Sequence, residues 1–433
     1  MFDLCIVGAG MMGSAAARHA SLISGIKLCL VGPSEPQDKA SVDHGIFGAH
    51  YDEGRITRCS DPDPVWATLA QESIKRYRDI ERASGISFYS EVGALMVGKT
   101  DTPYIANVFD VAKEQNIPTK RLNSAELQEH FPYIKFNSSD GGLFEYQNAG
   151  HISPRKLVHA QKMLAMKNGC TYIDDVVTKV HMSVAKNGDY VMNVETKGGD
   201  KAIVCKKVLL ATGAFTELNA LLPGIKVDQV LCPLTVSLVE VSKEQAEQQL
   251  KSMPSVIYRG DGHASWHRDF PRYEDNGVGY YMLPPIKYPD GRYYIKLGHF
   301  HGTVLRRLQG SGEVKEWFLN GDHQLAEQTA ALIKSLFKDV PMSRWHGDSC
   351  VVVETPTNRT LHRHGTCPAG GGNWRERLCC KKQRRDRSYC GNDDVTRMGF
   401  THTTRRFSIK NDNWKTNYHK VEDMNVSIYF ERF

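Results

Sequence analysis

The first residues of the chain carry the feature that most constrains its fold. A short apolar run, DLCIV at residues 3–7, is followed at once by G-A-G-M-M-G at residues 8–13 and then by the alanine-rich segment SAAARHASL. This order predicts a strand, a tight turn and a helix that together bind the pyrophosphate of a dinucleotide at the helix N-terminus. The alternative is a glycine-rich turn that binds nothing, and the strand and helix on either side argue against it. We expect cofactor contacts from Gly8, Ala9, Gly10, Met12 and Gly13.

The composition is that of a globular protein with a large core. The chain has 433 residues, of which 41% are hydrophobic, and its length suggests roughly two to three structural units. No apolar run approaches the roughly 18 residues of a membrane helix, and residues 3–7 resemble a buried strand more than a signal peptide. We therefore expect no membrane association and a cytoplasmic location, with a peroxisomal one as the alternative. Seven cysteines are scattered singly, as in a reducing compartment: Cys5, Cys29, Cys59, Cys170, Cys205, Cys232 and Cys350.

The positive net charge comes from the end of the chain. Residues 359–433 hold 16 Lys and Arg against 8 Asp and Glu, whereas the residues before them hold 39 against 41. The main body therefore gives no reason to expect nucleic-acid binding.

Two further segments belong to the predicted dinucleotide site. A second apolar run, KLCLV at residues 27–31, is followed by Gly32, where an acidic residue usually binds the ribose. The nearest acid is Glu35, which we expect to take that role. The run KVLLATG at residues 207–213 predicts a buried strand whose end, at Ala211 and Gly213, closes the cofactor site. A plain strand end is the alternative.

Residues 48–58, GAHYDEGRITR, make a family resemblance specific. The chain resembles the sarcosine oxidase group of the D-amino-acid-oxidase superfamily, from Phe2 to about Asn358. The resemblance implies FAD as cofactor, Arg55 against the isoalloxazine ring and Arg58 paired with the substrate carboxylate. A guanidinium is a suitable fork for a carboxylate, although two arginines three residues apart are more often a solvated helix face. The same segment implies flavin-site contacts from His50, Tyr51, Arg55 and Thr57.

The resemblance continues downstream. Val177 matches a turn that contacts the adenosine part, and residues 279–284 and 294–299 match paired strands of a substrate domain. It implies that Lys296 lies over the flavin and promotes reaction with oxygen, because a buried cation can stabilise superoxide-like charge. An exposed strand lysine is the alternative. We expect Tyr281, with Tyr280, to wall the amine side of the pocket.

Cys350 falls where sarcosine oxidases carry the cysteine that forms a thioether to the flavin. The tyrosine usual two residues later is Val352 here. The resemblance therefore implies FAD held covalently through Cys350, and an unmodified buried cysteine is the competing interpretation.

After Asn358 the sequence changes character. Hydrophobic periodicity fades, and RERLCCKKQRRDRSYC appears at residues 375–390. This segment could be a basic tail that binds zinc or nucleic acid, but its spacings fit no regular zinc scheme. Read one nucleotide out of register, residues 371–392 are compatible with a string containing GGNGYAAKSS, which resembles the family's closing flavin-binding segment. We interpret residues 359–433 as an aberrant tail, out of frame or disordered, so this chain's activity could be impaired.

The expected fold class is α/β, with a Rossmann-like FAD-binding domain interleaved with an antiparallel-sheet substrate domain. We assign residues 1–90, 150–225 and 340–358 to the first domain and residues 91–149 and 226–339 to the second. By resemblance, the expected enzyme is an FAD-dependent oxidoreductase that oxidises the C–N bond of an N-methyl or cyclic secondary amino acid, with oxygen as acceptor, hydrogen peroxide as product and no metal ion. The alternatives are an amine dehydrogenase that uses a partner acceptor and a non-catalytic flavin- or metal-binding protein with a basic tail.

Overall fold

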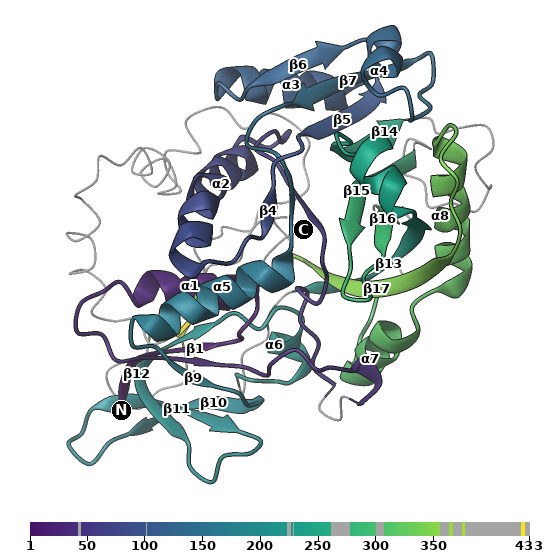
Figure 1. The fold of residues 1–433 in the computed structure, drawn as a ribbon. Coiled ribbons are helices and arrows are strands. Elements are labelled where there is room, and N and C mark those ends of the chain that lie inside the picture. The colour runs from purple at the N-terminus through teal and green to yellow at the C-terminus, as the bar shows by residue number, and fades with distance from the viewer. Residues whose placement is uncertain are drawn as a thin grey trace.

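The computed structural model describes most of the chain before residue 356. The described residues are 1–41, 45–100, 102–222, 227, 229–260, 278–299 and 307–355, together with three short strands, β18 (Arg363–Thr366), β19 (Arg375–Glu376) and β20 (Val426–Ile428). They form two large sheets with helices packed against them (Figure 1). Among these residues, no helix is both long enough and apolar enough to cross a membrane.

The first sheet is built on four parallel strands in the order β12-β1-β2-β9: β1 (Phe2–Val7), β2 (Leu28–Val31), β9 (Thr171–Ile173) and β12 (Ile203–Leu210). β10 (Val177–Val184) and β11 (Tyr190–Thr196) extend it as an antiparallel pair next to β12. Both apolar runs read from the sequence are buried strands here, as expected where a parallel sheet is covered on both faces. The helices α1 (Met11–Ala20) and α5 (Pro154–Lys167) pack against each other beside this sheet (Figure 1).

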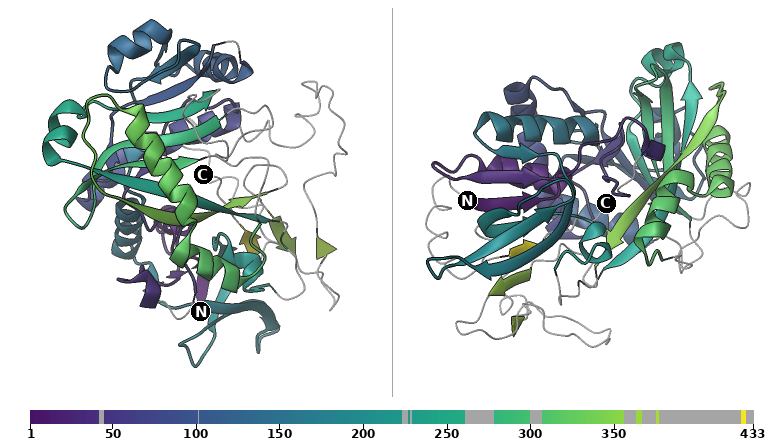
Figure 2. Two further views of the ribbon diagram at one scale, coloured as in Figure 1. Left: turned by 90° about the vertical axis from the view of Figure 1, so that its right-hand side faces the viewer. Right: turned by 90° about the horizontal axis from the view of Figure 1, so that it is seen from below.

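The second sheet has the order β17-β13-β16-β15-β14-β5-β7-β6. Its strands are β5 (Ala94–Lys99), β6 (Thr119–Leu122), β7 (Asp140–Glu145), β13 (Val230–Val241), β14 (Ser255–Gly260), β15 (Val278–Lys287), β16 (Tyr293–His299) and β17 (Trp345–Glu354). All neighbours are antiparallel except β14 and β5, which run parallel. Figure 2 shows helix α8 (His323–Leu336) lying along one face of this sheet, where Ser237 Oγ donates a 2.6 Å hydrogen bond to the Ala326 carbonyl.

The remaining elements connect or cover the two sheets. A three-stranded sheet has the order β3-β8-β4, from β3 (Arg55–Thr57), β8 (Gly150–Ile152) and β4 (Tyr89–Ser90). The helices are α2 (Pro64–Ser84), α3 (Pro103–Glu114), α4 (Ser124–His130), α6 (Phe215–Leu218) and α7 (Ser311–Asn320), with a 3-10 turn at Lys39–Ser41 and a π-turn at Gln245–Gln249. Local sequence sets the ends of the long helix α2. Asp63 accepts a hydrogen bond from Val65 N at its start, and Gly85 ends it with φ +71°.

The predicted fold class is confirmed, because a parallel dinucleotide-type sheet and a largely antiparallel sheet are both present. The domain boundaries stay a prediction. We note that β17, which lies in residues 340–358, pairs with β13 in the second sheet. Most of residues 359–433, for which we predicted an aberrant tail, lies outside the described residues, including the cysteines and His362.

Candidate functional site

The glycines at the end of β1 form a cradle that larger residues would fill. Gly8 has φ +102°, and a Cβ on it would lie 2.3 Å from the Ala211 carbonyl oxygen. A Cβ on Gly13 would lie 1.7 Å from the Gly8 oxygen, so the helix starts in direct contact with the turn. At Gly10, by contrast, a Cβ would make only an ordinary contact, with His50 Nδ1 as the nearest atom at 3.7 Å. This is the division of roles that a pyrophosphate-binding turn requires.

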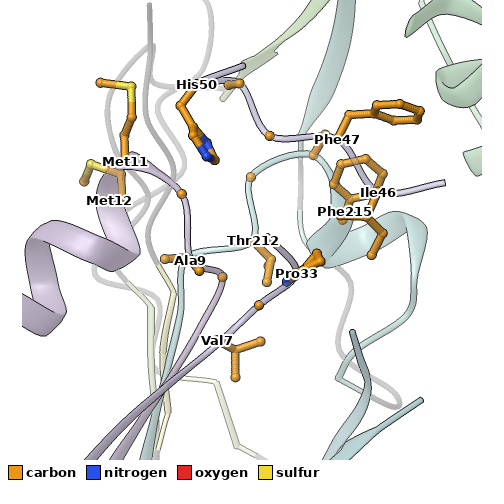
Figure 3. Close-up of a pocket in the computed structure, with 18 of the residues that line it drawn as sticks. Val7, Ala9, Met11, Met12, Pro33, Ile46, Phe47, His50, Thr212 and Phe215 are labelled. Carbon is orange, nitrogen blue, oxygen red and sulfur yellow. The ribbon is translucent and has the colours of Figure 1, made fainter. Parts of the chain in front are cut away.

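The cradle opens into a pocket between α1, the end of β2, residues 46–51 and the turn after β12 (Figure 3). Most of the predicted cofactor contacts line it: Gly8, Ala9, Gly10, Met12, His50, Tyr51, Val177, Ala211 and Gly213. Sequence reasoning missed the apolar wall, where Phe47 and Phe318 stack with their ring centres 4.6 Å apart. Phe318 is 271 positions after Phe47 in the sequence, so no local pattern could have paired them.

His50 supplies a buried polar atom in this pocket. Its side chain points into the pocket in Figure 3, and within the described part of the chain its Nδ1 has no hydrogen-bond partner. Burial, followed by the positive charges of Arg55, Lys162 and Arg155, lowers the pKa of His50 to about 3. The ring is therefore neutral at physiological pH and has one nitrogen available to a ligand. Together with the glycine cradle, this unpaired nitrogen fits the phosphate and sugar groups of a bound dinucleotide such as FAD.

The structure explains why position 32 has no acidic residue and shows what Glu35 contacts. A Cβ at Gly32 would lie 2.6 Å from Ala9 N, so the usual acid does not fit at that position. Arg155 donates to both oxygens of Glu35, from Nε at 2.7 Å and from Nη2 at 2.5 Å, and it also pairs with Glu53. Glu35 does not line the pocket, and its ribose contact stays a prediction. No local pattern indicated Arg155 as the partner of Glu35, because the two residues are 120 positions apart.

Of the two predicted arginines, Arg55 begins β3 and Arg58 directly follows its last residue. Arg55 Nη2 donates to the Ala49 carbonyl at 2.6 Å, which fixes the loop that lines the pocket. Arg58 Nη1 donates to Ser60 O at 2.5 Å and to Asp61 at 3.0 Å. Burial opposes the charge of Arg58, but Asp61 and other neighbours outweigh this effect and raise its pKa. The predicted contact residue Thr57 is turned away from the pocket.

Thr57 Oγ1 lies 3.2 Å from the Tyr77 hydroxyl in a buried contact with α2. Its expected flavin contact is therefore not supported by its position, and it stays a prediction only.

Strand register places three predicted residues on one face of the second sheet. Cys350 is opposite Leu234, Lys296 is opposite Leu238, and Tyr281 is opposite Gly298, which in turn is opposite Val236. Since alternate residues of β13 point the same way, Cys350, Lys296 and Tyr281 share a face. We call this the site face.

Tyr280 lies on the opposite face. It stacks on Tyr258 with the ring centres 4.9 Å apart, so the prediction that it walls the amine side is wrong. The reason is the two-residue period of a strand, which cannot present two consecutive side chains to one face.

Lys296 is buried, with 6% of its surface exposed, so it is not the solvated strand lysine of the alternative interpretation. Its ammonium group pairs with Asp52, donates to Gly54 O at 3.2 Å and lies 6.0 Å from the ring centre of Tyr281. Asp52 also accepts a 2.9 Å hydrogen bond from the Tyr288 hydroxyl. Burial lowers the pKa of Lys296, but Asp52 more than compensates and raises it above the usual value. Lys296 is therefore a permanent cation on the site face.

Cys350 has a free thiol close to these charges. Burial raises its pKa, and the nearby charges of Lys296 and Arg55 act in the opposite direction. Trp317 Nε1 donates to the Cys350 carbonyl at 3.1 Å, which holds β17 against α7. The next residue, Val351, points to the other face and lines the pocket.

Comparison with known proteins agrees with this geometry. The family model described as FAD dependent oxidoreductase matches residues 3–370. Monomeric sarcosine oxidase of Streptomyces avermitilis is 30% identical over 169 residues, which are 39% of this chain and 42% of that protein. N-methyl-L-tryptophan oxidase of Citrobacter koseri is 23% identical over 288 residues, 65% of this chain and 67% of that protein. The matches thus span about two fifths to two thirds of these relatives.

Solved structures show the same fold. A mutant of NikD in its open form, described as an unusual amino acid oxidase essential for nikkomycin biosynthesis, has a TM-score of 0.64 at 17% identity and covers 84% of both chains. At that identity the likeness concerns the fold alone. Because the family model matches most of the chain and the glycine cradle has the shape that a dinucleotide requires, the chain belongs to the FAD-dependent oxidoreductase family.

Proposed function

We propose that the enzyme oxidises the C–N bond of an N-methyl or cyclic secondary amino acid and that oxygen is its acceptor, giving hydrogen peroxide. The observation that carries this proposal is the site face, on which Lys296 and Tyr281 lie together, with Arg55 at the start of β3 and Arg58 directly after its last residue. The names of the sarcosine and N-methyltryptophan oxidases that the chain resembles support the substrate class.

Bound FAD would supply the redox chemistry by accepting a hydride from the substrate and passing electrons to oxygen. The glycine cradle and His50 would hold its phosphates and sugars. Arg58 would bind the substrate carboxylate, because within the described residues both of its hydrogen bonds use Nη1, and Nη2 and Nε stay available. Tyr281 would pack against the amine side. The ammonium group of Lys296 would stabilise negative charge that develops on oxygen.

The proposal includes two further contacts with FAD. Cys350 lies on the site face, which is compatible with a covalent link to FAD through its sulfur. Glu35 would contact the ribose only if Arg155 released one carboxylate oxygen or shared it.

The rival enzyme is a dehydrogenase that delivers electrons to a partner protein. The two acceptors are distinguished by measuring amine-dependent peroxide formation with N-methylglycine and pipecolate, and repeating the assay with ferrocenium without oxygen. We expect peroxide formation that falls when Lys296 is replaced by Met, with little change in the ferrocenium rate. Turnover with ferrocenium alone would support the dehydrogenase, and no turnover with any secondary amine would refute the proposed function.

A further inference from the structure

Glu145, the last residue of β7, lies on the site face, although neither the motifs nor the resemblance indicated it. Tyr281 of β15 is opposite Ile257 of β14. Ile257 is also opposite Met96 of β5, which in turn is opposite Leu143 of β7. Directly paired residues point to the same face, and Glu145 is two positions after Leu143, so it projects from the same face as Tyr281. It is fully buried, with 0% of its surface exposed.

The carboxylate of Glu145 holds the turn that follows Arg58. One of its oxygens accepts a hydrogen bond from Cys59 N and the other accepts one from Ser60 N, each at 2.8 Å. The buried thiol of Cys59 also donates to the Asn148 carbonyl at 3.7 Å, in the loop between β7 and β8. The backbone directly after Arg58 is therefore attached to the end of β7 at two successive residues.

The guanidinium group of Arg58 depends on the same turn. Its Nη1 donates to Ser60 O at 2.5 Å, so the residue whose N–H binds Glu145 also accepts from Arg58. Nη1 donates as well to one oxygen of Asp61 at 3.0 Å, and the other oxygen accepts from Asp63 N at 2.9 Å, next to the start of α2. A shift of the turn would therefore move the guanidinium group with it.

Two buried side chains of opposite charge attach this segment to the site face. Lys296 binds acceptors before β3, namely the Asp52 carboxylate and the Gly54 carbonyl, whereas Glu145 binds donors after β3. Burial raises the pKa of Glu145, while its N–H contacts and the charge of Arg58 act in the opposite direction. A carboxylate suits this position because both of its oxygens are acceptors. An amide has only one oxygen and would direct its own N–H groups at one of the two backbone donors.

We infer that Glu145 is a positioning residue for Arg58, and that its carboxylate determines how well the enzyme distinguishes a substrate carboxylate from an uncharged group. The inference rests on the proposed function for the role of Arg58 as the residue that binds the substrate carboxylate. Glu145 acts through the turn and not by contact with the substrate, because both of its oxygens are bound to the backbone.

The kinetic test compares N-methylglycine with its uncharged amide, N-methylglycinamide. The unmodified enzyme should favour N-methylglycine in kcat/KM, and Glu145→Gln should reduce that preference roughly 10-fold, as expected when a charged hydrogen bond is lost. Loss of folded enzyme lowers both rates equally, so a purely structural effect leaves the ratio unchanged. If Glu145→Gln does not fold, Glu145→Asp keeps the charge, shortens the side chain by one methylene, and should change the preference in the same direction.

Glu81 of α2 offers a matched control. Its carboxylate also accepts two backbone hydrogen bonds, from Phe88 N at 2.7 Å and from Tyr89 N at 2.8 Å, near the opposite end of α2 from Asp63. Glu81→Gln should therefore disturb a turn of the same kind and leave the substrate preference unchanged. An equal loss of preference in Glu81→Gln and Glu145→Gln would refute the positioning role.

A double-mutant cycle shows whether Glu145 acts through Arg58. Arg58→Gln should remove most of the preference for N-methylglycine, and adding Glu145→Gln to it should cause no further loss. If Glu145→Gln lowers the preference as much in the Arg58→Gln background as in the unmodified enzyme, the two residues act independently and the inference fails.

Binding separates this inference from the proposed function. Isothermal titration of the full chain with acetate and with acetamide needs no turnover, and the tighter binding of acetate should be lost in Glu145→Gln and retained in Glu81→Gln. If no amine is oxidised but acetate binding depends on both Glu145 and Arg58, the positioning role stands and the proposed reaction fails. If amines are oxidised with a preference that Arg58→Gln abolishes and Glu145→Gln leaves unchanged, the proposed reaction stands and the positioning role is refuted.

Discussion

The buried pair of Lys296 and Asp52 gives the sharpest test of the site. Replacing Asp52 with Asn keeps the shape of the side chain and removes its charge. Lys296, which is 6% exposed, would then remain in the interior with the Gly54 carbonyl as its main acceptor. Tyr288, which donates to Asp52, could still donate to the amide oxygen. The substitution therefore changes mainly the electrostatics of Lys296.

The expected cost is large because one charge of a buried pair is left without its counterion. Removing one partner of such a pair typically destabilises a protein by about 3–5 kcal/mol. As a control, Asp348→Asn breaks the pair with Lys39, in which both side chains are 33% exposed, and should cost about 0–1 kcal/mol after solvent screening. The difference between the two variants isolates the effect of burial.

The pH dependence follows from the two pKa shifts. Burial alone would raise the pKa of Asp52, but Lys296 outweighs it and the pKa is lowered. This contribution is present above the unfolded value of about 3.9 and is lost as the pH falls through the lowered folded value. The pKa of Lys296 is raised, so its contribution is present below about 10.4 and is lost as the pH rises through the raised folded value. The extra stability should therefore span about pH 4 to 10.

Urea unfolding followed by tryptophan fluorescence measures these effects. The double variant Asp52→Asn with Lys296→Met should recover much of the loss, because it removes the unpaired charge. A loss below about 1 kcal/mol in Asp52→Asn, or single and double variants whose effects simply add, would show that the two groups are not coupled as the structure indicates.

Four further outcomes are expected. Gly8→Ala should abolish FAD binding, since its Cβ would lie 2.3 Å from a backbone oxygen. Gly10→Ala should fold normally and only weaken FAD binding. Equal FAD affinity of the two variants in a fluorescence titration would contradict the proposed role of the glycine cradle. The pKa of His50 is lowered to about 3, so its contribution to stability is present above about pH 6.5 and is lost as the pH falls toward 3. His50→Gln should therefore flatten the acid side of the curve of unfolding free energy against pH. An unchanged acid side would show that the ring is not buried as described. If Cys350 is linked to FAD, acid-precipitated protein should remain yellow and Cys350→Ala should release the colour; free FAD in the supernatant of the unmodified protein would leave Cys350 an ordinary thiol. Restoring the reading frame near Arg359 should strengthen FAD binding and raise amine-dependent peroxide production, and equal activity of the two chains would refute the frame interpretation.

Local sequence was enough to predict the parts of the site that depend on local geometry. The glycine spacing at residues 8–13 follows from contacts within one strand, turn and helix, and the structure shows those contacts at Gly8 and Gly13. The fold class was likewise predictable, because continuous apolar runs mark parallel strands. Lys296 and Cys350 were proposed as site residues through resemblance, since a single strand pattern does not say which face is buried. Tyr280 shows the limit of assigning residues by resemblance, because Tyr280 and Tyr281 are consecutive in a strand and must point to opposite faces of the sheet.

The parts that could not be predicted depend on charges that meet across long sequence separations. Three charged residues of the segment HYDEGR at residues 50–55 contact different parts of the molecule. Asp52 pairs with Lys296, 244 residues later on β16 of the second sheet. Glu53 pairs with Arg155, 102 residues later at the start of α5 beside the first sheet. Arg55 donates to the loop that lines the pocket.

These contacts give the segment a structural role that its sequence alone would not reveal. Because Asp52 and Glu53 are adjacent and pair in opposite directions, the loop is tied to both sheets at once. The position of the site face relative to the glycine cradle therefore depends on two ion pairs as well as on apolar packing. Breaking the Glu53 pair should leave Lys296 paired with Asp52, whereas breaking the Asp52 pair should leave Glu53 paired with Arg155. Asp52 and Glu53 are therefore neighbouring residues whose ion pairs can be broken separately, one with Lys296 of the second sheet and the other with Arg155 beside the first sheet.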